Sequence, residues 1–131
     1  MIFLKSSLAS ALLVVALFSA TTAWAGDLTG PQENAVRSAK QYLSTEGFSR
    51  RELIQQLSSS AGSGYSVADA TVAVDSLHID WDKEAVRSAK QYLSIEGFSC
   101  RGLIHQLSSS AGSGYTVNQA TYGAQQSGAC P

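Results

Sequence analysis

Residues 35–65 read AVRSAKQYLSTEGFSRRELIQQLSSSAGSGY, and residues 85–115 read AVRSAKQYLSIEGFSCRGLIHQLSSSAGSGY. Of these 31 aligned positions, four differ, namely Thr45/Ile95, Arg50/Cys100, Glu52/Gly102 and Gln55/His105. A period of this length is typical of a duplicated supersecondary unit. We therefore predict a fold built from one small unit that is used twice.

The bulk composition limits the classes of partner. The chain has 131 residues, a formal net charge of −1 and 44% hydrophobic residues. Nucleic-acid-binding proteins normally carry a clear basic excess, which is absent here. Hydrophobic content at this level is ordinary for a globular protein. The composition predicts a globular chain with no nucleic-acid partner.

The first 25 residues have the pattern of a secretory signal peptide. Lys5 precedes an apolar run over residues 8–20, and Ala23 and Ala25 stand before a predicted cut ahead of Gly26. The run is shorter than the roughly 20 residues of a membrane span. We predict an exported protein that is periplasmic, envelope-associated or secreted, with membrane association only if the signal stays uncleaved.

Each copy contains two helical patterns before its glycine-rich stretch. In the first helix Val36, Ala39 and Leu43 recur at helical spacing. We expect Gly47 to end this helix in the left-handed conformation. The second helix starts after Ser49, which with Glu52 matches a capping box.

A third helix is predicted after each glycine-rich stretch. Its apolar stripe in the first copy consists of Val67, Ala70, Val74 and Leu77. The second copy has a capping box at Thr116 and Gln119 but a weaker stripe that contains Gly123. We expect this last helix to fray unless Cys130 holds it.

These patterns predict an all-α fold with two tandem three-helix, helix-turn-helix-like repeats after the signal peptide. The boundaries are residues 1–25 for the signal, 26–79 for repeat 1 and 80–131 for repeat 2. Because the linker over residues 78–83 is short, we expect the repeats to touch, with Ile79 and Trp81 at the joint and Asp80 or Asp82 capping the next helix.

Cys100 and Cys130 are the two cysteines of the chain. In an oxidising compartment such a pair is most simply a disulfide. Closing a loop of this length is worth about 3–4 kcal/mol in the chain-entropy model.

The sequence shows no constellation for catalysis, metal binding or a cofactor. His78 and His105 lack partners at metal-ligand spacing, and no serine motif of a hydrolase appears. The third helix of repeat 1 carries Asp69 and Asp75, which phosphates would repel. We predict a non-catalytic binding protein that does not read DNA.

An acidic cluster surrounds the linker and consists of Asp75, Asp80, Asp82 and Glu84. One interpretation is a solvated joint in which these residues cap helices. The other is a docking surface for a basic segment of a partner protein. Both stay open on the sequence alone.

The repeats resemble the Ltp-type host cell surface-exposed lipoprotein family. The motif combines A-x-x-A-x-x-Y-L, F-S-x-x-x-L-x-x-Q-L and G-x-G-[YF]-[ST]-x-x-x-A. Its first occurrence is carried by Ala35, Tyr42, Leu43, Phe48, Ser49, Leu53, Gln56, Leu57, Gly62, Gly64, Tyr65, Ser66 and Ala70. Its second is carried by Ala85, Tyr92, Leu93, Phe98, Ser99, Leu103, Gln106, Leu107, Gly112, Gly114, Tyr115, Thr116 and Ala120.

The resemblance implies an exported protein of a phage or prophage that acts in superinfection exclusion. Such proteins sit outside the cytoplasmic membrane and block DNA entry by an incoming phage, with its tape-measure or tail protein as partner. The present chain departs from the family pattern because no lipoprotein cysteine lies near the predicted cut. The alternative interpretation is a cell-envelope structural or adhesion module that binds wall or membrane material.

Overall fold

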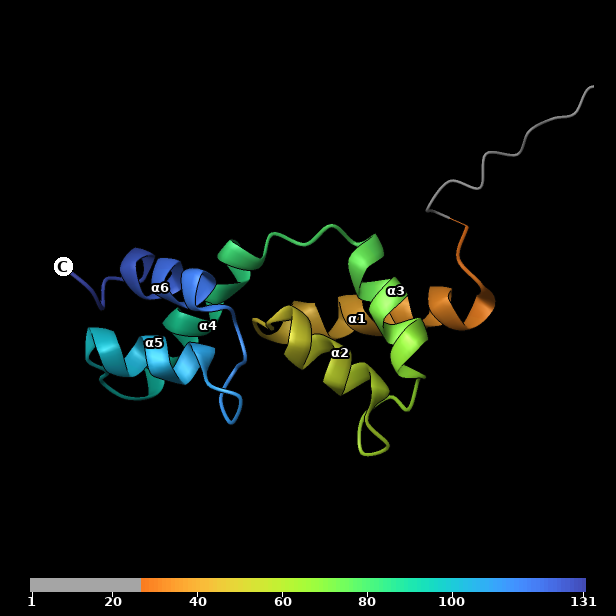
Figure 1. Ribbon diagram of the computed structural model, residues 1–131, viewed down its shortest axis with the longest axis horizontal. Helices are drawn as coiled ribbons and strands as arrows, with labels where there is room; N and C mark the ends of the chain where they lie inside the picture. The colour runs from red at the N-terminus through yellow and green to blue at the C-terminus, as the bar shows by residue number, and fades with distance from the viewer. Residues whose placement is uncertain (1–26) are drawn as a thin grey trace, which may run out of the picture.

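The computed structural model describes residues 27–131, which form six helices and no strands (Figure 1). The helices of repeat 1 are α1 (Gly30–Thr45), α2 (Arg50–Ser58) and α3 (Val67–Ser76). Those of repeat 2 are α4 (Trp81–Ile95), α5 (Cys100–Ser108) and α6 (Val117–Gln126). The predicted all-α fold with two three-helix repeats is confirmed. The predicted signal peptide lies outside the described residues.

Every helix begins after a residue whose side chain accepts a backbone N–H of the first turn. These N-caps are Thr29, Ser49, Ser66, Asp80, Ser99 and Thr116. The capping box predicted at Thr116 and Gln119 is present. At the box predicted for Ser49 and Glu52, the Ser49 hydroxyl accepts from the Glu52 amide at 3.0 Å. Asp80 proves to be the cap of α4.

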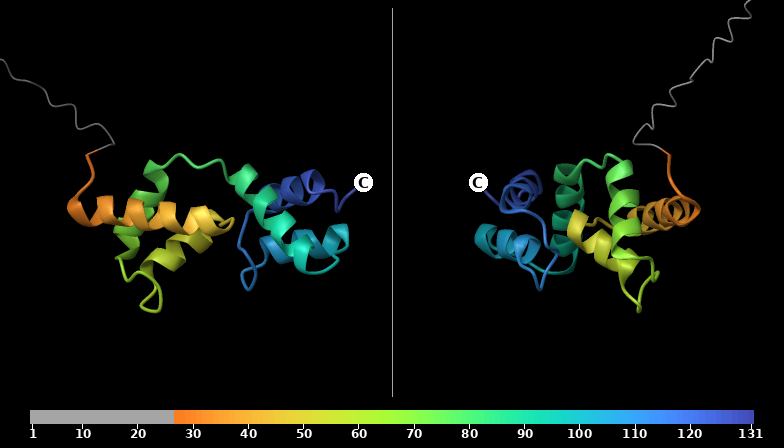
Figure 2. Two further views of the ribbon diagram at one scale, coloured as in Figure 1. Left: turned by 180° about the vertical axis from the view of Figure 1, so that it is seen from behind. Right: turned by 45° about the vertical axis from the view of Figure 1, so that its right-hand side comes forward.

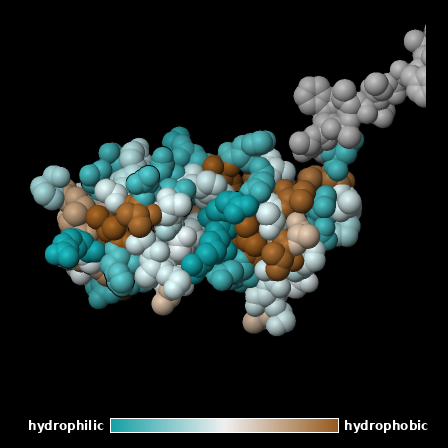
Figure 3. Space-filling view, in the orientation of Figure 1, coloured by the Kyte–Doolittle hydropathy of each residue, from teal (hydrophilic) through white to brown (hydrophobic). Residues whose placement is uncertain are grey.

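Each repeat has its own core. In repeat 1 the buried apolar cluster contains Ala39, Phe48, Leu53, Leu57, Ala70 and Val74. In repeat 2 it contains Ala85, Ala89, Leu103, Leu107, Tyr115, Ala120 and Ala124. On the face seen in Figure 3 the apolar residues gather in separate groups over the two repeats, with more polar residues between them. Ile79 and Trp81 pack against the repeat 1 core.

The third helix of each repeat buries a face made of small residues. Ala70, Ala73 and Val74 are buried, whereas Val67 is 64% exposed because it is the first residue of α3. The predicted stripe was therefore wrong at Val67. Gly123, which we expected to weaken α6, is buried instead: a Cβ there would lie 2.7 Å from the carbonyl of Ala85. The glycine thus allows α6 to approach α4 closely.

A different tie joins the start of the second helix to the end of the third in each repeat. In repeat 2 the predicted disulfide between Cys100 and Cys130 is present, with Cα atoms 4.7 Å apart. In repeat 1 Arg50 takes the place of Cys100 and makes a bidentate ion pair with Asp75, at 2.8 and 3.0 Å. The pair is exposed, and such pairs contribute about 0–1 kcal/mol. The covalent tie of repeat 2 is the stronger constraint.

Candidate interaction surface

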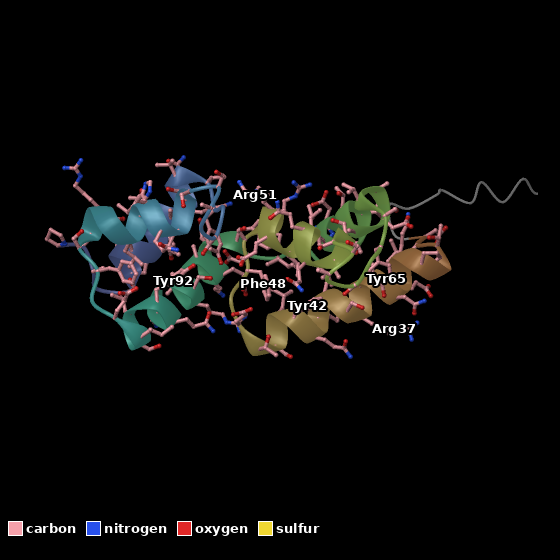
Figure 4. The ribbon with its side chains drawn as sticks, turned by 90° about the horizontal axis from the view of Figure 1, so that it is seen from below. Arg37, Tyr42, Phe48, Arg51, Tyr65 and Tyr92 are labelled. Carbon is pink, nitrogen blue, oxygen red and sulfur yellow. A yellow bond between two sulfur atoms is a disulfide. The ribbon has the colours of Figure 1, made fainter. Side chains whose placement is uncertain are left out.

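The turn between α1 and α2 docks on repeat 2. The Gly47 N–H donates to Gln91 Oε1 at 3.0 Å, and the Phe48 N–H donates to Glu84 Oε2 at 3.2 Å. The Ser49 hydroxyl donates to the carbonyl of Ser113. Phe48 lies between the two repeats in Figure 4. The polar groups of one turn are therefore satisfied by the neighbouring repeat.

Two arginines, one from each repeat, complete the joint. Arg51 Nη2 donates to the Ser110 carbonyl at 2.6 Å, and Figure 4 shows Arg51 directed toward the α5–α6 loop. Arg87 Nη1 donates to the Leu43 carbonyl at 2.8 Å. Leu43 lies near the end of α1, whose last turn has no basic residue of its own. Arg87 thus supplies the cation that the negative end of this helix dipole favours.

Gly47 is required by close approach and not by its backbone conformation. A Cβ at Gly47 would lie 2.6 Å from Ser88 Oγ and 2.9 Å from both the Glu84 carbonyl and the Ser88 amide. Its φ is not positive, so the predicted left-handed cap was wrong; α1 ends through an extended Glu46. The absence of a side chain lets the turn lie directly on the backbone of α4.

The two repeats use the same three residues differently. Gly47, Phe48 and Ser49 are buried, and Phe48 is only 3% exposed. The identical turn at residues 97–99 of repeat 2 has an exposed glycine, a half-buried phenylalanine and an exposed serine. The difference arises from the joint alone, so the local sequence could not reveal it.

The surface that receives the turn contains a buried hydroxyl pair. Ser88 Oγ and Tyr115 Oη are 2.7 Å apart, and both residues are buried. Burial raises the pKa of the Tyr115 phenol, against the opposing effect of the hydrogen bond with Ser88. The matching pair in repeat 1, Ser38 and Tyr65, is 3.0 Å apart and only partly buried. Docking therefore seals one of two otherwise similar pairs from water.

Glu52 lies at the edge of the joint. It lines a cavity of about 140 Å³ together with Glu46, Gly47, Ser88, Gln91, Tyr92, Ile95 and Ser113. Burial raises the pKa of the Glu52 carboxyl, and the nearby Glu46 acts in the same direction. Gly102 holds the matching position in repeat 2, where no such joint is formed. The glutamate is thus found in the repeat whose turn is docked, and the glycine in the repeat whose turn is free.

Comparison with known proteins identifies the family of the chain. The family model of the Ltp host cell surface-exposed lipoproteins matches residues 31–77 and again residues 80–126. The chain belongs to this family. The solved structure of Ltp, a superinfection exclusion protein from the Streptococcus thermophilus temperate phage TP-J34, is similar, with a TM-score of 0.67 and 33% sequence identity. The match covers 75% of the present chain and 96% of that one. No curated protein matches the chain.

The four acidic residues predicted as a partner surface have diverse surroundings in this Ltp-family chain. Asp75 pairs with Arg50, which lowers the pKa of its carboxyl. Asp80 caps α4, accepting from the Lys83 amide at 3.1 Å. Glu84 receives the Phe48 N–H and lies 3.2 Å from Arg87 Nη1. Asp82 is exposed in the first turn of α4. Three of the four therefore stabilise the fold, and the acidic docking surface stays a prediction centred on Asp82.

The remaining candidates for chemistry are dispersed. Within residues 27–131 no three acidic, histidine or cysteine side chains gather as a possible metal site. His78 is exposed after α3 with a φ of 47°, and His105 is exposed on α5. None of the described helices is long and apolar enough to cross a membrane. The short linker predicted that the repeats touch, but the residues that form the joint, at the α1–α2 turn and on α4, gave no signal in the sequence.

Proposed function

We propose that this protein excludes superinfecting phage from a cell that already produces it. The observation that carries the proposal is the match to a phage superinfection exclusion protein, which extends over 96% of that structure and includes both repeats. Fold similarity alone would not carry a function. Here the sequence identity and the tandem arrangement of the same repeat support the proposal in addition to the fold.

In this proposal the chain acts outside the cytoplasmic membrane and blocks entry of DNA after a phage has adsorbed. The partner is a protein of the incoming phage, with the tape-measure or another tail protein as the first candidate. The action is binding and not catalysis. The family description, a host cell surface-exposed lipoprotein, supports this location.

The contact surface in this proposal is acidic and centres on Asp82. Its carboxylate stands exposed at the start of α4, where it is available to a basic segment of the partner. Complementary charge of this kind mainly raises the rate and specificity of association. Asp75, Asp80 and Glu84 contribute to the local negative potential while they hold the fold.

The test is phage challenge of cells that express the full chain, with adsorption and DNA entry measured separately. We expect normal adsorption and reduced entry. The matched control is the same chain without residues 2–25, which is kept in the cytoplasm and is expected to give no protection. Unchanged entry across a broad phage panel, or equal protection by the cytoplasmic chain, would contradict the proposal; the first result would favour the envelope-module alternative.

A second experiment isolates the acidic surface. Asp82→Lys reverses an exposed charge in the first turn of α4, and Glu33→Lys makes the same change in the first turn of α1. Both variants lose a similar helix-dipole interaction, of about 0.3–1 kcal/mol. We expect only Asp82→Lys to weaken protection. Equal protection by both variants would remove the acidic surface from the mechanism and leave the exclusion function standing.

A further inference from the structure

The joint between the repeats is one-sided. Repeat 1 contributes a donor turn, defined as residues 47–51. Repeat 2 contributes an acceptor face, which consists of Glu84, Arg87, Ser88, Gln91, Ser110 and Ser113. In such a heterologous contact the two surfaces differ. Each repeat therefore keeps one of the two surfaces unused.

Both unused surfaces carry the residues that make the joint. The free donor turn of repeat 2 keeps Gly97, Phe98, Ser99 and Arg101 at the matching positions. The free acceptor face of repeat 1 keeps Arg37, Ser38, Gln41, Ser60 and Ser63. Among the side chains that hydrogen-bond across the joint, the one change is Asn34 in place of Glu84, while Gly102 and Thr45 replace Glu52 and Ile95, which line the cavity at its edge. The Asn34 amide oxygen still accepts a backbone N–H.

The unused surfaces are already in the conformation of the engaged ones. The rings of Tyr92 and Phe98 meet edge to face at 5.9 Å, as those of Tyr42 and Phe48 do. On the acceptor side Tyr42 Oη is 2.9 Å from Ser63 Oγ, and the matching distance to the hydroxyl of the engaged Ser113 is 2.8 Å. Docking at these surfaces would therefore require little reorganisation.

Two further features mark the free donor turn as unoccupied. A Cβ at Gly97 would meet no atom within 4 Å, in contrast to the crowded Gly47. The last turn of α4 also lacks a basic residue of its own. In repeat 1 the corresponding end is satisfied by Arg87 from the neighbouring repeat. Arg37 of another molecule has the chemistry to satisfy the end of α4 in the same way.

The free surfaces lie toward opposite ends of the molecule. In Figure 1 the α1–α2 turn faces repeat 2, whereas the α4–α5 turn lies at the far end, near the C-terminus. The start of α1 lies at the other end, and the two views of Figure 2 agree with this placement. Figure 4 shows Arg37 at the outer edge of α1, in the half of the molecule away from repeat 2.

We propose that copies of this chain associate head to tail, with the α4–α5 turn of one molecule docked on the acceptor face of α1 and the α2–α3 loop of the next. Because the contact is heterologous, each added molecule leaves one surface free at each end of the assembly. The assembly therefore grows into a longer chain unless the rotation between successive molecules closes it into a ring. This association is independent of phage exclusion, so either proposal can fail without the other.

The expected association is weak. Within the chain the linker keeps the two surfaces close together, at an effective concentration of about 1 mM. Two separate molecules have no such linker, so they must reach a similar concentration to associate. The contacts that define the joint are hydrogen bonds between polar groups, and polar interfaces are typical of transient contacts. The assay must therefore reach protein concentrations of about 1 mM.

Sedimentation velocity of the exported, oxidised chain tests the proposal with two blocked variants. Gly97→Trp fills the open space at the donor turn, and Gln41→Trp places a bulky side chain on the exposed acceptor face. We expect the mean mass of the wild type to rise with concentration, while each variant alone stays monomeric. An equimolar mixture of the two variants should form dimers and nothing larger, because each partner retains one working surface.

Controls distinguish a blocked surface from a loss of folding and from association through another surface. Both substitutions lie outside the joint within the chain, so the melting temperature in dilute solution should not change. Arg101→Glu, a milder change in the donor turn, should also reduce association. A wild type that stays monomeric up to the highest concentration would overturn the proposal. Association that persists equally in both blocked variants would overturn it as well, because another surface would then be responsible.

Discussion

Replacing either of two glycines with alanine tests whether the repeats are docked in solution. Gly47 and Gly97 lie in the same local sequence, Glu-Gly-Phe-Ser, and neither has a positive φ. The Cβ of Gly47→Ala would come within 2.9 Å of two backbone atoms of α4. Backbone cannot move aside as a flexible side chain can. The turn must therefore retreat from repeat 2.

The magnitude follows from the contacts that the retreat disturbs. Overpacking of this kind costs about 1–3 kcal/mol, and weakening the hydrogen bonds of Gly47 and Phe48 adds about 0.5–1.5 kcal/mol for each bond lost. For a chain of this size, each kcal/mol lowers the melting temperature by about 4–8 °C. Gly97→Ala meets open space and restricts the unfolded chain, so we expect a change from zero to about +1 kcal/mol.

The assay is thermal unfolding of the chain from Gly26 onward, followed by calorimetry and by the fluorescence of Trp81. This tryptophan is at the start of α4 and packs against the repeat 1 core, so it reports on the joint. We expect the Gly47→Ala protein to melt clearly below the wild type and the Gly97→Ala protein to melt at or above it. Equal melting temperatures for the two variants would refute the reasoning, since only the Gly47 position lies against the backbone of the other repeat.

Three further perturbations have defined outcomes. Tyr115→Phe leaves a buried serine hydroxyl without its partner and should cost about 1–3 kcal/mol in urea unfolding, whereas Tyr65→Phe at the half-exposed pair should cost about 1 kcal/mol or less; equal losses would contradict the sealed joint. Reducing the Cys100–Cys130 disulfide should lower the free energy of unfolding by about 3–4 kcal/mol, and an unchanged urea midpoint after reduction would show that the bond constrains little. Burial raises the pKa of Glu52 above its ordinary 4.5, so the native state binds this proton more tightly and stability declines as pH rises through the raised pKa. The melting temperature of Glu52→Gln, measured relative to that of the wild type, should therefore rise from acid to neutral pH. A difference in melting temperature that stays the same at every pH would count against this.

The helices were predictable because their signals are local. Cap residues such as Thr116 and the apolar spacing around Leu53 and Leu57 fix where each helix begins and which face is buried. The disulfide followed from two cysteines and an export signal. Errors arose where position in the helix outweighed apolar character, as at Val67, whose place at the start of α3 leaves it in solvent.

The residues that form the joint were not predictable from the sequence, although the short linker indicated that the repeats touch. Gly47 and Gly97 have the same neighbours in sequence, yet only Gly47 lies against another backbone. The acidic cluster illustrates the same limit, because Glu84 looked like a free surface charge and proves to accept the Phe48 N–H. Identical segments can differ in role whenever the packing of one repeat on the other breaks their equivalence.

Amide hydrogen exchange measured by NMR on the wild-type chain tests the docked joint most directly. The Gly47 and Phe48 N–H groups donate to Gln91 and Glu84, whereas the amides at residues 97 and 98 have no such partner within the described chain. The structure predicts slow exchange for the first pair and fast exchange for the second. Equally fast exchange at all four amides would show that the repeats are not docked, and the account of the joint would fail.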